Sequence, residues 1–156
     1  MIHIILAIVF QPGATPTLES DIPPYTISDA NAGAEPYAGD RLFTAFNGRP
    51  GVDRVAADLV AFSIVDPRIA DIFQGHDLTR LNRTLSEQFC YLLGGGCAYT
   101  GRDMAAVHKD MGLQTADLNA LIENLQRAMD KEGVPFRAQN KLLARLAPMK
   151  PHIVER

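Results

Sequence analysis

The sequence predicts an all-α protein, and three observations support this fold class. Apolar residues recur at spacings of three and four in several stretches, which is the period of a helix with one buried face. No stretch shows a good alternation of apolar and polar residues, the pattern typical of a half-buried strand. Proline or glycine follows each helical stretch, so each expected helix has a definite end.

The composition fits one domain with a modest core. The chain has 156 residues, of which 47% are hydrophobic and 21% are charged, and these are ordinary values for a globular protein. The net charge is only −3, and no long basic run occurs. Nucleic acid is therefore excluded as an expected partner, because its binding leaves a basic footprint.

The first ten residues, MIHIILAIVF, form the most hydrophobic run of the chain. The run is too short for a transmembrane helix, which needs about 20 apolar residues, but its length suits a secretory signal. We therefore expect residues 1–10 to be a signal or anchor segment of a periplasmic or exported protein. No Lys or Arg precedes the run and no clear cleavage site follows it. A buried segment of a cytoplasmic protein thus remains the alternative.

Residues 11–40 are rich in Pro, Gly, Ala, Ser, Thr and Asp. Such a composition offers little apolar surface for a core, so we expect an extended or disordered N-terminal arm. An arm of this kind is free to contact a membrane or another protein. The folded domain is expected over residues 41–156.

Four helices are expected in that domain. The first lies within residues 52–66 and ends before Pro67, because the residue preceding a proline disfavours the helical conformation. Asp77 is a suitable N-cap for the second helix, whose apolar stripe continues to the glycines at 94–96. The third helix follows Thr115, and the fourth begins at Pro135.

The stretch GGGCAYTGRDMAAVHKDMGL, residues 94–113, interrupts the helical pattern and carries His108. A structural zinc site needs about four protein ligands, and no partners for His108 lie nearby in the sequence. The glycines follow a helix and lack the Lys-Ser/Thr pair of a phosphate-binding loop. A single imidazole can still ligate haem iron, because the porphyrin supplies the other nitrogen ligands. A half-exposed surface histidine is the alternative at this point.

This stretch resembles the signature of the group I truncated haemoglobins, Gly-Gly-Pro-x-x-Tyr-x-Gly-x-x-Met-x-x-x-His followed by a short Gly-Leu. The residues that carry the resemblance are Gly94, Gly95, Tyr99, Thr100, Gly101, Met104, His108, Gly112 and Leu113, whereas Gly96 replaces the proline. Two further segments also resemble segments of the family, DPRIADIF and GVPFRAQNKLLARLAPM. The likeness therefore runs from about Leu42 to Met149. The resemblance implies a truncated globin fold, a two-over-two helical sandwich around one haem b, with His108 as the ligand of the iron.

The resemblance also implies which side chains surround the haem. Cofactor contacts are implied for Phe73, Leu81, Leu85, Tyr99, Arg102, Met104, Val107, Leu118 and Leu121. Many family members carry a tyrosine where Val60 stands and a glutamine where Leu81 or Leu85 stands. The distal pocket here would then be formed by Val60, Phe73, Leu81 and Leu85, with Gln88 as a polar member if it turns inward.

The implied function is reversible binding of a diatomic ligand, O₂, CO or NO, at a haem iron with an apolar distal side. A haem-dependent enzyme, either an NO dioxygenase or a peroxidase-like protein, is an alternative that the missing distal polar groups disfavour. A second alternative is a haem-free globin subunit that docks on a partner. A third alternative is electron transfer or redox sensing at the haem edge.

Cys90 and Cys97 are the only cysteines. A branch of the same family resembles this chain in carrying both residues in exported-looking proteins, which implies a disulfide if the chain is exported. In a cytoplasmic protein, Cys90 would instead be a small buried side chain.

Overall fold

The computed structural model describes residues 19–155, and every regular element in this range is helical. The helices are α1 (Arg41–Ala45), α2 (Gly48–Ser63), α3 (Leu78–Leu92), α4 (Met104–His108), α5 (Thr115–Lys131), α6 (Phe136–Leu146) and α7 (Lys150–Ile153). Three short 3₁₀ turns join them, η1 (Asp29–Ala32), η2 (Ala70–Phe73) and η3 (Ala147–Met149). The predicted all-α class is confirmed. The expected signal or anchor segment at residues 1–10 lies outside the described residues.

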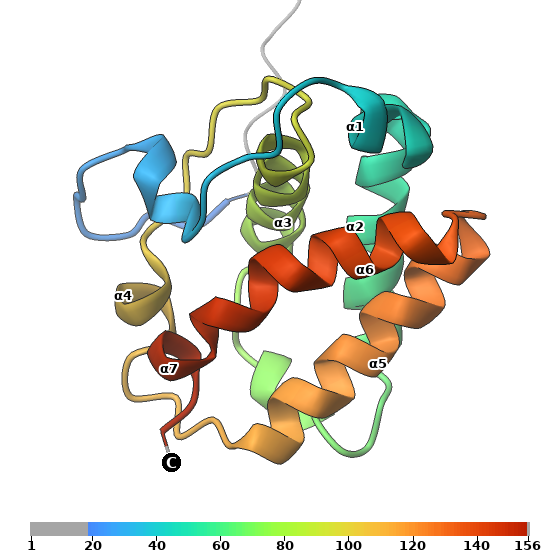
Figure 1. Cartoon of the computed structure of the whole chain (residues 1–156). Coiled ribbons are helices and arrows are strands. Elements are labelled where there is room, and N and C mark those ends of the chain that lie inside the picture. The colour runs from blue at the N-terminus through green and yellow to red at the C-terminus, as the bar shows by residue number, and fades with distance from the viewer. Residues whose placement is uncertain (1–18, 156) are drawn as a thin grey trace, which may run out of the picture.

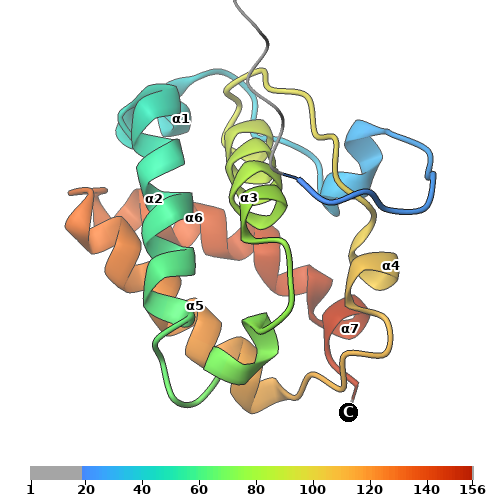
Figure 2. The ribbon, with the colours of Figure 1, turned by 180° about the vertical axis from the view of Figure 1, so that it is seen from behind.

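The four long helices form two layers. Helix α2 packs against both α3 and α5, and α6 also packs against α3 and α5. Figures 1 and 2 show the α2–α3 pair crossing the α5–α6 pair from opposite sides of the molecule. None of the helices described over residues 19–155 is long and apolar enough to span a membrane.

The helix ends follow local hydrogen bonding. The Asp77 carboxylate accepts the backbone N–H of Arg80 at 2.9 Å, so the predicted cap of α3 is confirmed. Helix α2 ends at Ser63, earlier than expected, because Pro67 has no N–H to donate to the Ser63 carbonyl, which accepts the N–H of Asp66 at 3.3 Å instead. Thr115 is the first residue of α5 rather than its cap, and Gln114 occupies the cap position.

The core lies between the two helical layers. Its largest fully buried side chains come from the α1–α2 junction and from α2, α3, α5 and α6, and they include Phe46, Leu59, Phe89, Leu92, Leu93, Met129 and Leu142. Fully burying a side chain of this size contributes roughly 1.5–3 kcal/mol to stability. The sandwich is therefore held mainly by apolar packing at the centre of the four long helices.

Residues 19–40 form an arm that is mostly extended but folded onto the domain (Figures 1 and 2). Ala32 in this arm is fully buried, and the N–H of Tyr37 donates to the Leu92 carbonyl at 2.9 Å. Gly94 has a φ of +84°, and a Cβ there would lie 2.1 Å from the carbonyl oxygen of Gly39. The expectation that the arm buries little is thus corrected for its described part, because backbone pairing and small side chains let it pack closely.

A disulfide joins Cys90, in the last turn of α3, to Cys97 in the following loop, with a Cα–Cα distance of 5.7 Å. The Arg49 guanidinium lies 3.2 Å from the Cys97 sulfur. The bridge spans the glycine stretch and fixes where the chain leaves α3. The path from this helix to His108 therefore starts from a covalently fixed point.

Candidate functional site

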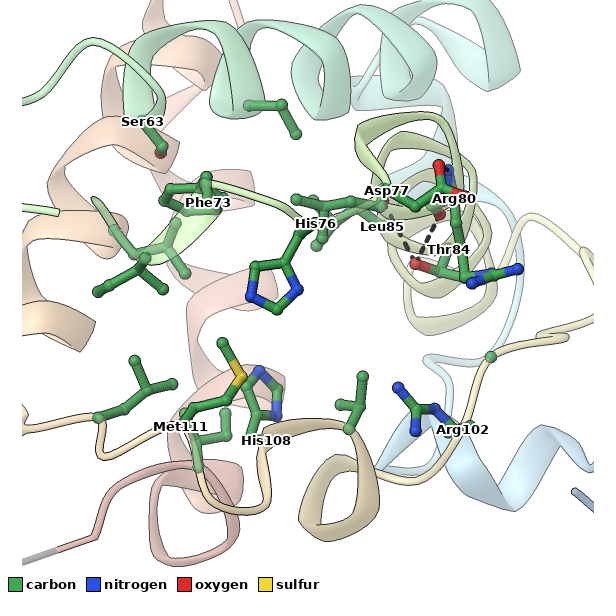
Figure 3. A pocket seen from close by; sticks show the side chains of 18 of the residues that line it. Ser63, Phe73, His76, Asp77, Arg80, Thr84, Leu85, Arg102, His108 and Met111 are labelled. Carbon is green, nitrogen blue, oxygen red and sulfur yellow. Dashed lines mark hydrogen bonds between the residues drawn. The ribbon is translucent and has the colours of Figure 1, made fainter. Parts of the chain in front are cut away.

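A cavity of about 460 Å³ lies between α2, η2, the first turns of α3, the α4 segment and α5 (Figure 3). This volume is within the range of about 300–1,000 Å³ that is typical of sites for small molecules and cofactors. Most of its lining side chains are apolar, and His108 stands on its floor. The cavity is therefore suited to a large, mainly apolar group.

His108 is the last residue of α4, a helix of only 5 residues that Asp103 caps by accepting the N–H of Ala106 at 2.9 Å. The Nδ1 atom of His108 lies 2.8 Å from the backbone oxygen of Met104. Because a carbonyl oxygen can only accept, Nδ1 carries the proton and Nε2 keeps its lone pair. The short helix thus fixes the tautomer that has Nε2 free to act as a ligand.

Burial lowers the pKa of His108 below its usual value, the nearby Arg102 charge lowers it further, and the Met104 carbonyl opposes the shift. The neutral imidazole is the form that can bind a metal ion. No group of three or more His, Cys, Asp or Glu side chains that could hold a metal ion occurs among residues 19–155. His108 is therefore suited to be one axial ligand of a metal whose other ligands come from a cofactor.

Val60, Phe73, Leu81 and Leu85, the apolar residues expected on the distal side, all line the cavity, and Figure 3 shows Phe73 and Leu85 across it from His108. The hydroxyls of Ser63 and Thr84 also line the cavity, and the sequence reasoning missed both residues. Each lies three positions after an expected wall residue, on the same helix face, so helical spacing could have found them. The Thr84 hydroxyl donates to the Arg80 carbonyl at 3.0 Å, and it is therefore not a free donor.

Gln88 and Met104 do not line the cavity, which differs from the expectation for both residues. The buried Gln88 amide donates to the carbonyl oxygen of Ala32 in the arm at 2.9 Å. It also lies 3.7 Å from the Met104 sulfur, in the core behind the cavity wall. Gln88 turns away because its amide must find a buried partner, and the arm provides one. The distal side therefore receives no amide from Gln88.

The remaining expected residues, Tyr99, Arg102, Val107, Leu118 and Leu121, line the cavity together. The Tyr99 hydroxyl donates to the Arg102 carbonyl at 3.0 Å, and burial raises the pKa of Tyr99 to about 12. The hydroxyl therefore stays protonated and holds the loop that leads to α4. Other lining residues were not expected, notably Ile22, Tyr25, His76, Arg80, Met111 and Ile153.

A two-layer helical domain in which the His108 imidazole faces a large, mostly apolar cavity defines a class, the haem proteins of globin type. The sequence profile of the bacterial-like globins matches residues 41–155. The chain belongs to the bacterial-like globin family, and its relatives place it with the group I truncated globins.

Two relatives illustrate the likeness. The group 1 truncated haemoglobin of Mycolicibacterium paratuberculosis is 27% identical over 112 residues, which cover 72% of this chain and 82% of that protein. The group 1 truncated haemoglobin of a Nostoc species is 27% identical over 115 residues, which cover 74% of this chain and 98% of that protein.

Two solved structures share the fold. The truncated haemoglobin of Tetrahymena pyriformis in its Fe(III) form superposes with a TM-score of 0.70 at 22% identity, covering 74% of this chain and 98% of the other. The 2/2 haemoglobin of Synechococcus sp. PCC 7002, in a cyanomet state with covalently attached haem, gives a TM-score of 0.68 at 21% identity, with the same coverage of both chains. The two-over-two arrangement expected from the sequence is therefore confirmed.

Proposed function

We propose that this globin holds haem b and binds a diatomic ligand, O₂, CO or NO, reversibly on an apolar distal side. The observation that carries the proposal is the His108 imidazole, with Nδ1 fixed on the Met104 carbonyl at 2.8 Å and the ring facing an apolar cavity. When bound, haem b supplies an iron centre that takes up small gases. His108 would hold that iron through Nε2, and the Met104 carbonyl keeps the ring oriented.

The other lining residues fit the same group. A flat aromatic macrocycle suits the apolar walls, and Phe73 offers a ring to stack on it. The carboxylates of haem b suit guanidinium groups, which bind carboxylates with paired donors. Arg80 and Arg102 both line the cavity and lie on the same side of it in Figure 3.

The distal side determines which ligand is held best. Val60, Leu81 and Leu85 offer no N–H or O–H group, and Gln88 is bonded to the arm instead. A ligand that becomes partly negative, such as O₂, therefore lacks a hydrogen bond from these positions worth about 1–3 kcal/mol. We expect fast O₂ dissociation and faster autoxidation from a distal side formed by these apolar positions, whereas CO binding depends less on such a donor. His76 also lines the cavity and faces His108 in Figure 3, so its N–H is the group that could supply a distal hydrogen bond instead.

Visible spectra of the purified full-length chain test the proposal. The oxidised, reduced and reduced CO-treated forms should show a Soret band that shifts when CO is added. In His108→Gly this behaviour should be lost or should require added imidazole, while His152→Gly, which alters an exposed histidine of α7, should behave as wild type. Absence of haem from the wild-type protein after expression with haem supplied would contradict the proposal.

We further propose that the protein works in an oxidising compartment, the periplasm or outside the cell. The Cys90–Cys97 disulfide supports this, because such bonds persist mainly in oxidising environments. Fractionation of the native host should recover the protein outside the cytoplasm with no free thiol. Recovery of the reduced protein from the cytoplasm would contradict the assignment.

A further inference from the structure

The arm at residues 19–40 precedes the globin unit that this chain shares with its family. The family profile begins at residue 41, and 115 residues of this chain suffice to cover 98% of the Nostoc relative. The arm nevertheless lies along the α3 and α4 side of the domain in both views of the ribbon (Figures 1 and 2). It is therefore an addition to the shared fold, placed beside the cavity.

One end of the arm is anchored on α3, the helix that carries the distal wall. The Glu19 carboxylate accepts from the Arg83 guanidinium at 2.9 Å and lies 3.6 Å from that of Arg80. The N–H of Ser20 donates to the Asp77 carboxylate at 2.5 Å. These contacts attach the arm to the first turns of α3.

The other end is anchored on the loop that leads to His108. The Tyr25 hydroxyl donates to the Thr100 carbonyl, and the Asn31 amide donates to the Gly101 carbonyl at 3.3 Å. In return, the N–H of Tyr99 donates to the Asp29 carboxylate at 2.9 Å. The arm thus bridges the distal helix and the proximal loop.

Between the two anchors, Ile22 and Tyr25 line the same cavity as His108. Pro23 and Pro24 separate them and hold this part of the arm extended. Ile22 itself precedes a proline, which also favours an extended backbone. Two apolar side chains are thereby presented to the cavity at the edge where Arg80 and Arg102 lie.

We propose that residues 19–31 form an additional wall of the haem pocket, in which Ile22 and Tyr25 contact the cofactor and slow its loss. This inference rests on the proposed function, since it requires that the cavity holds haem. Covering an apolar edge of the cofactor removes area from water and strengthens binding. Tying both cavity walls together also limits the opening through which the cofactor leaves.

The test measures the rate of haem transfer from the full-length holoprotein to an excess of a haem-scavenging apoglobin. The Ile22→Ala/Tyr25→Ala variant should lose haem about tenfold faster than wild type, which corresponds to the loss of about 1.4 kcal/mol of apolar contact. Ile27→Ala is the matched control, because Ile27 lies in the same arm, is 63% exposed and does not line the cavity. Its rate should equal that of wild type.

A second variant keeps the test decisive if the double variant does not fold. Glu19→Gln leaves the cavity lining unchanged but removes the charged anchor on Arg83, and it should speed haem loss by a smaller factor. Unchanged rates of haem loss in both variants, with a normal Soret band, would contradict the proposal that residues 19–31 form a wall of the pocket, and would leave the proposed function unaffected. A wild-type chain without a Soret band would overturn both.

Discussion

At the scale of single residues, the orientation of the His108 ring depends on contacts that the sequence pattern does not predict. Its ring is oriented by the Met104 carbonyl, and the loop before it is held by the Tyr99 hydroxyl on the Arg102 carbonyl. Gly101 lies between Tyr99 and Arg102 in the chain and is buried. The proximal side is thus fixed mostly by backbone groups and by small residues that leave room for them.

Gly101→Ala should destabilise this loop. A Cβ at position 101 would lie 2.2 Å from the Tyr99 hydroxyl oxygen and 2.4 Å from the ring carbon that bears it. Such overpacking typically costs about 1–3 kcal/mol. Urea unfolding should show a lower midpoint with a weakened Soret band, whereas Gly96→Asn, at an exposed position with no atom within 4 Å of the added Cβ, should cost much less. A Gly101→Ala protein as stable as wild type would refute this packing.

Val60→Tyr should convert the apolar distal wall into one with a hydroxyl donor. Val60 is 4% exposed and lines the same cavity as His108. The new hydroxyl should slow O₂ dissociation by about tenfold or more, since a hydrogen bond to a partly charged group is worth over 1.4 kcal/mol. Stopped-flow replacement of O₂ by CO measures this rate. Val60→Phe adds the same bulk without the hydroxyl, so equal rates in the two variants would exclude the hydrogen bond as the cause.

At the scale of elements, two features fix where the helices begin and end. The Cys90–Cys97 bridge holds the end of α3, and Glu132 at the end of α5 binds Arg54 and Asn47 at the start of α2. Both act at helix ends, where backbone groups have fewest partners of their own. The bridge ties the loop that follows α3 to this helix, and the Glu132 contacts hold α5 against α2.

Breaking the disulfide should lower the free energy of unfolding by about 2 kcal/mol, the value expected for a loop as short as the one it closes. Urea unfolding with and without a reductant measures the change. A Cys90→Ala/Cys97→Ala variant should be less stable than the oxidised protein and insensitive to the reductant. An identical midpoint for oxidised and reduced wild type would contradict the prediction.

The stabilising effect of Glu132 should disappear in acid. The Arg54 guanidinium, at 2.6 and 2.8 Å from the two carboxylate oxygens, holds the pKa of Glu132 below its usual value. A carboxyl whose pKa is lower in the folded protein than in the unfolded chain stabilises the fold at pH values above its pKa in the unfolded chain. This stabilisation is lost as the pH falls through its pKa in the folded protein. The Tm difference between wild type and Glu132→Gln should therefore be present at pH 7 and shrink below about pH 4.

The control for this pH dependence is Glu35→Gln, which removes an exposed carboxylate from the arm. Its Tm should follow that of wild type at both pH values. A Glu132→Gln difference that stays constant from pH 7 to pH 3 would mean that the carboxylate acts through its shape rather than its charge.

At the scale of the whole molecule, the sequence predicted the helices and most of the cavity wall. The periodic stripes located α2, α3, α5 and α6, and the resemblance to the group I truncated haemoglobins pointed to Val60, Leu81 and Leu85. The direction in which the Gln88 side chain points was not predictable. Its hydrogen-bond acceptor is the Ala32 carbonyl, which lies in a segment without any periodic pattern. The docked arm was missed for the same reason. Its contacts pair residues far apart in the chain through backbone groups, which residue types alone do not encode.

Removing haem should lower the stability of the whole domain. A cofactor that binds only the folded state adds its binding free energy to folding, and without it the apolar walls of a cavity of about 460 Å³ lose their contacts. The apoprotein should unfold at a lower urea concentration than the holoprotein, and adding haem back should restore the midpoint. Equal midpoints would show that the cavity contributes nothing to the cooperative fold.

The cavity is lined by residues from near both limits of the described chain, Ile22 and Ile153. The C-terminal end is secured by the N–H of Glu155, which donates to the Leu113 carbonyl at 2.8 Å. Contacts between distant parts of a chain form late, since a long loop must close first. The helices bearing Val60, Leu85 and His108 therefore do not enclose the pocket by themselves, and its wall is complete only when the segments that carry Ile22 and Ile153 have packed beside them.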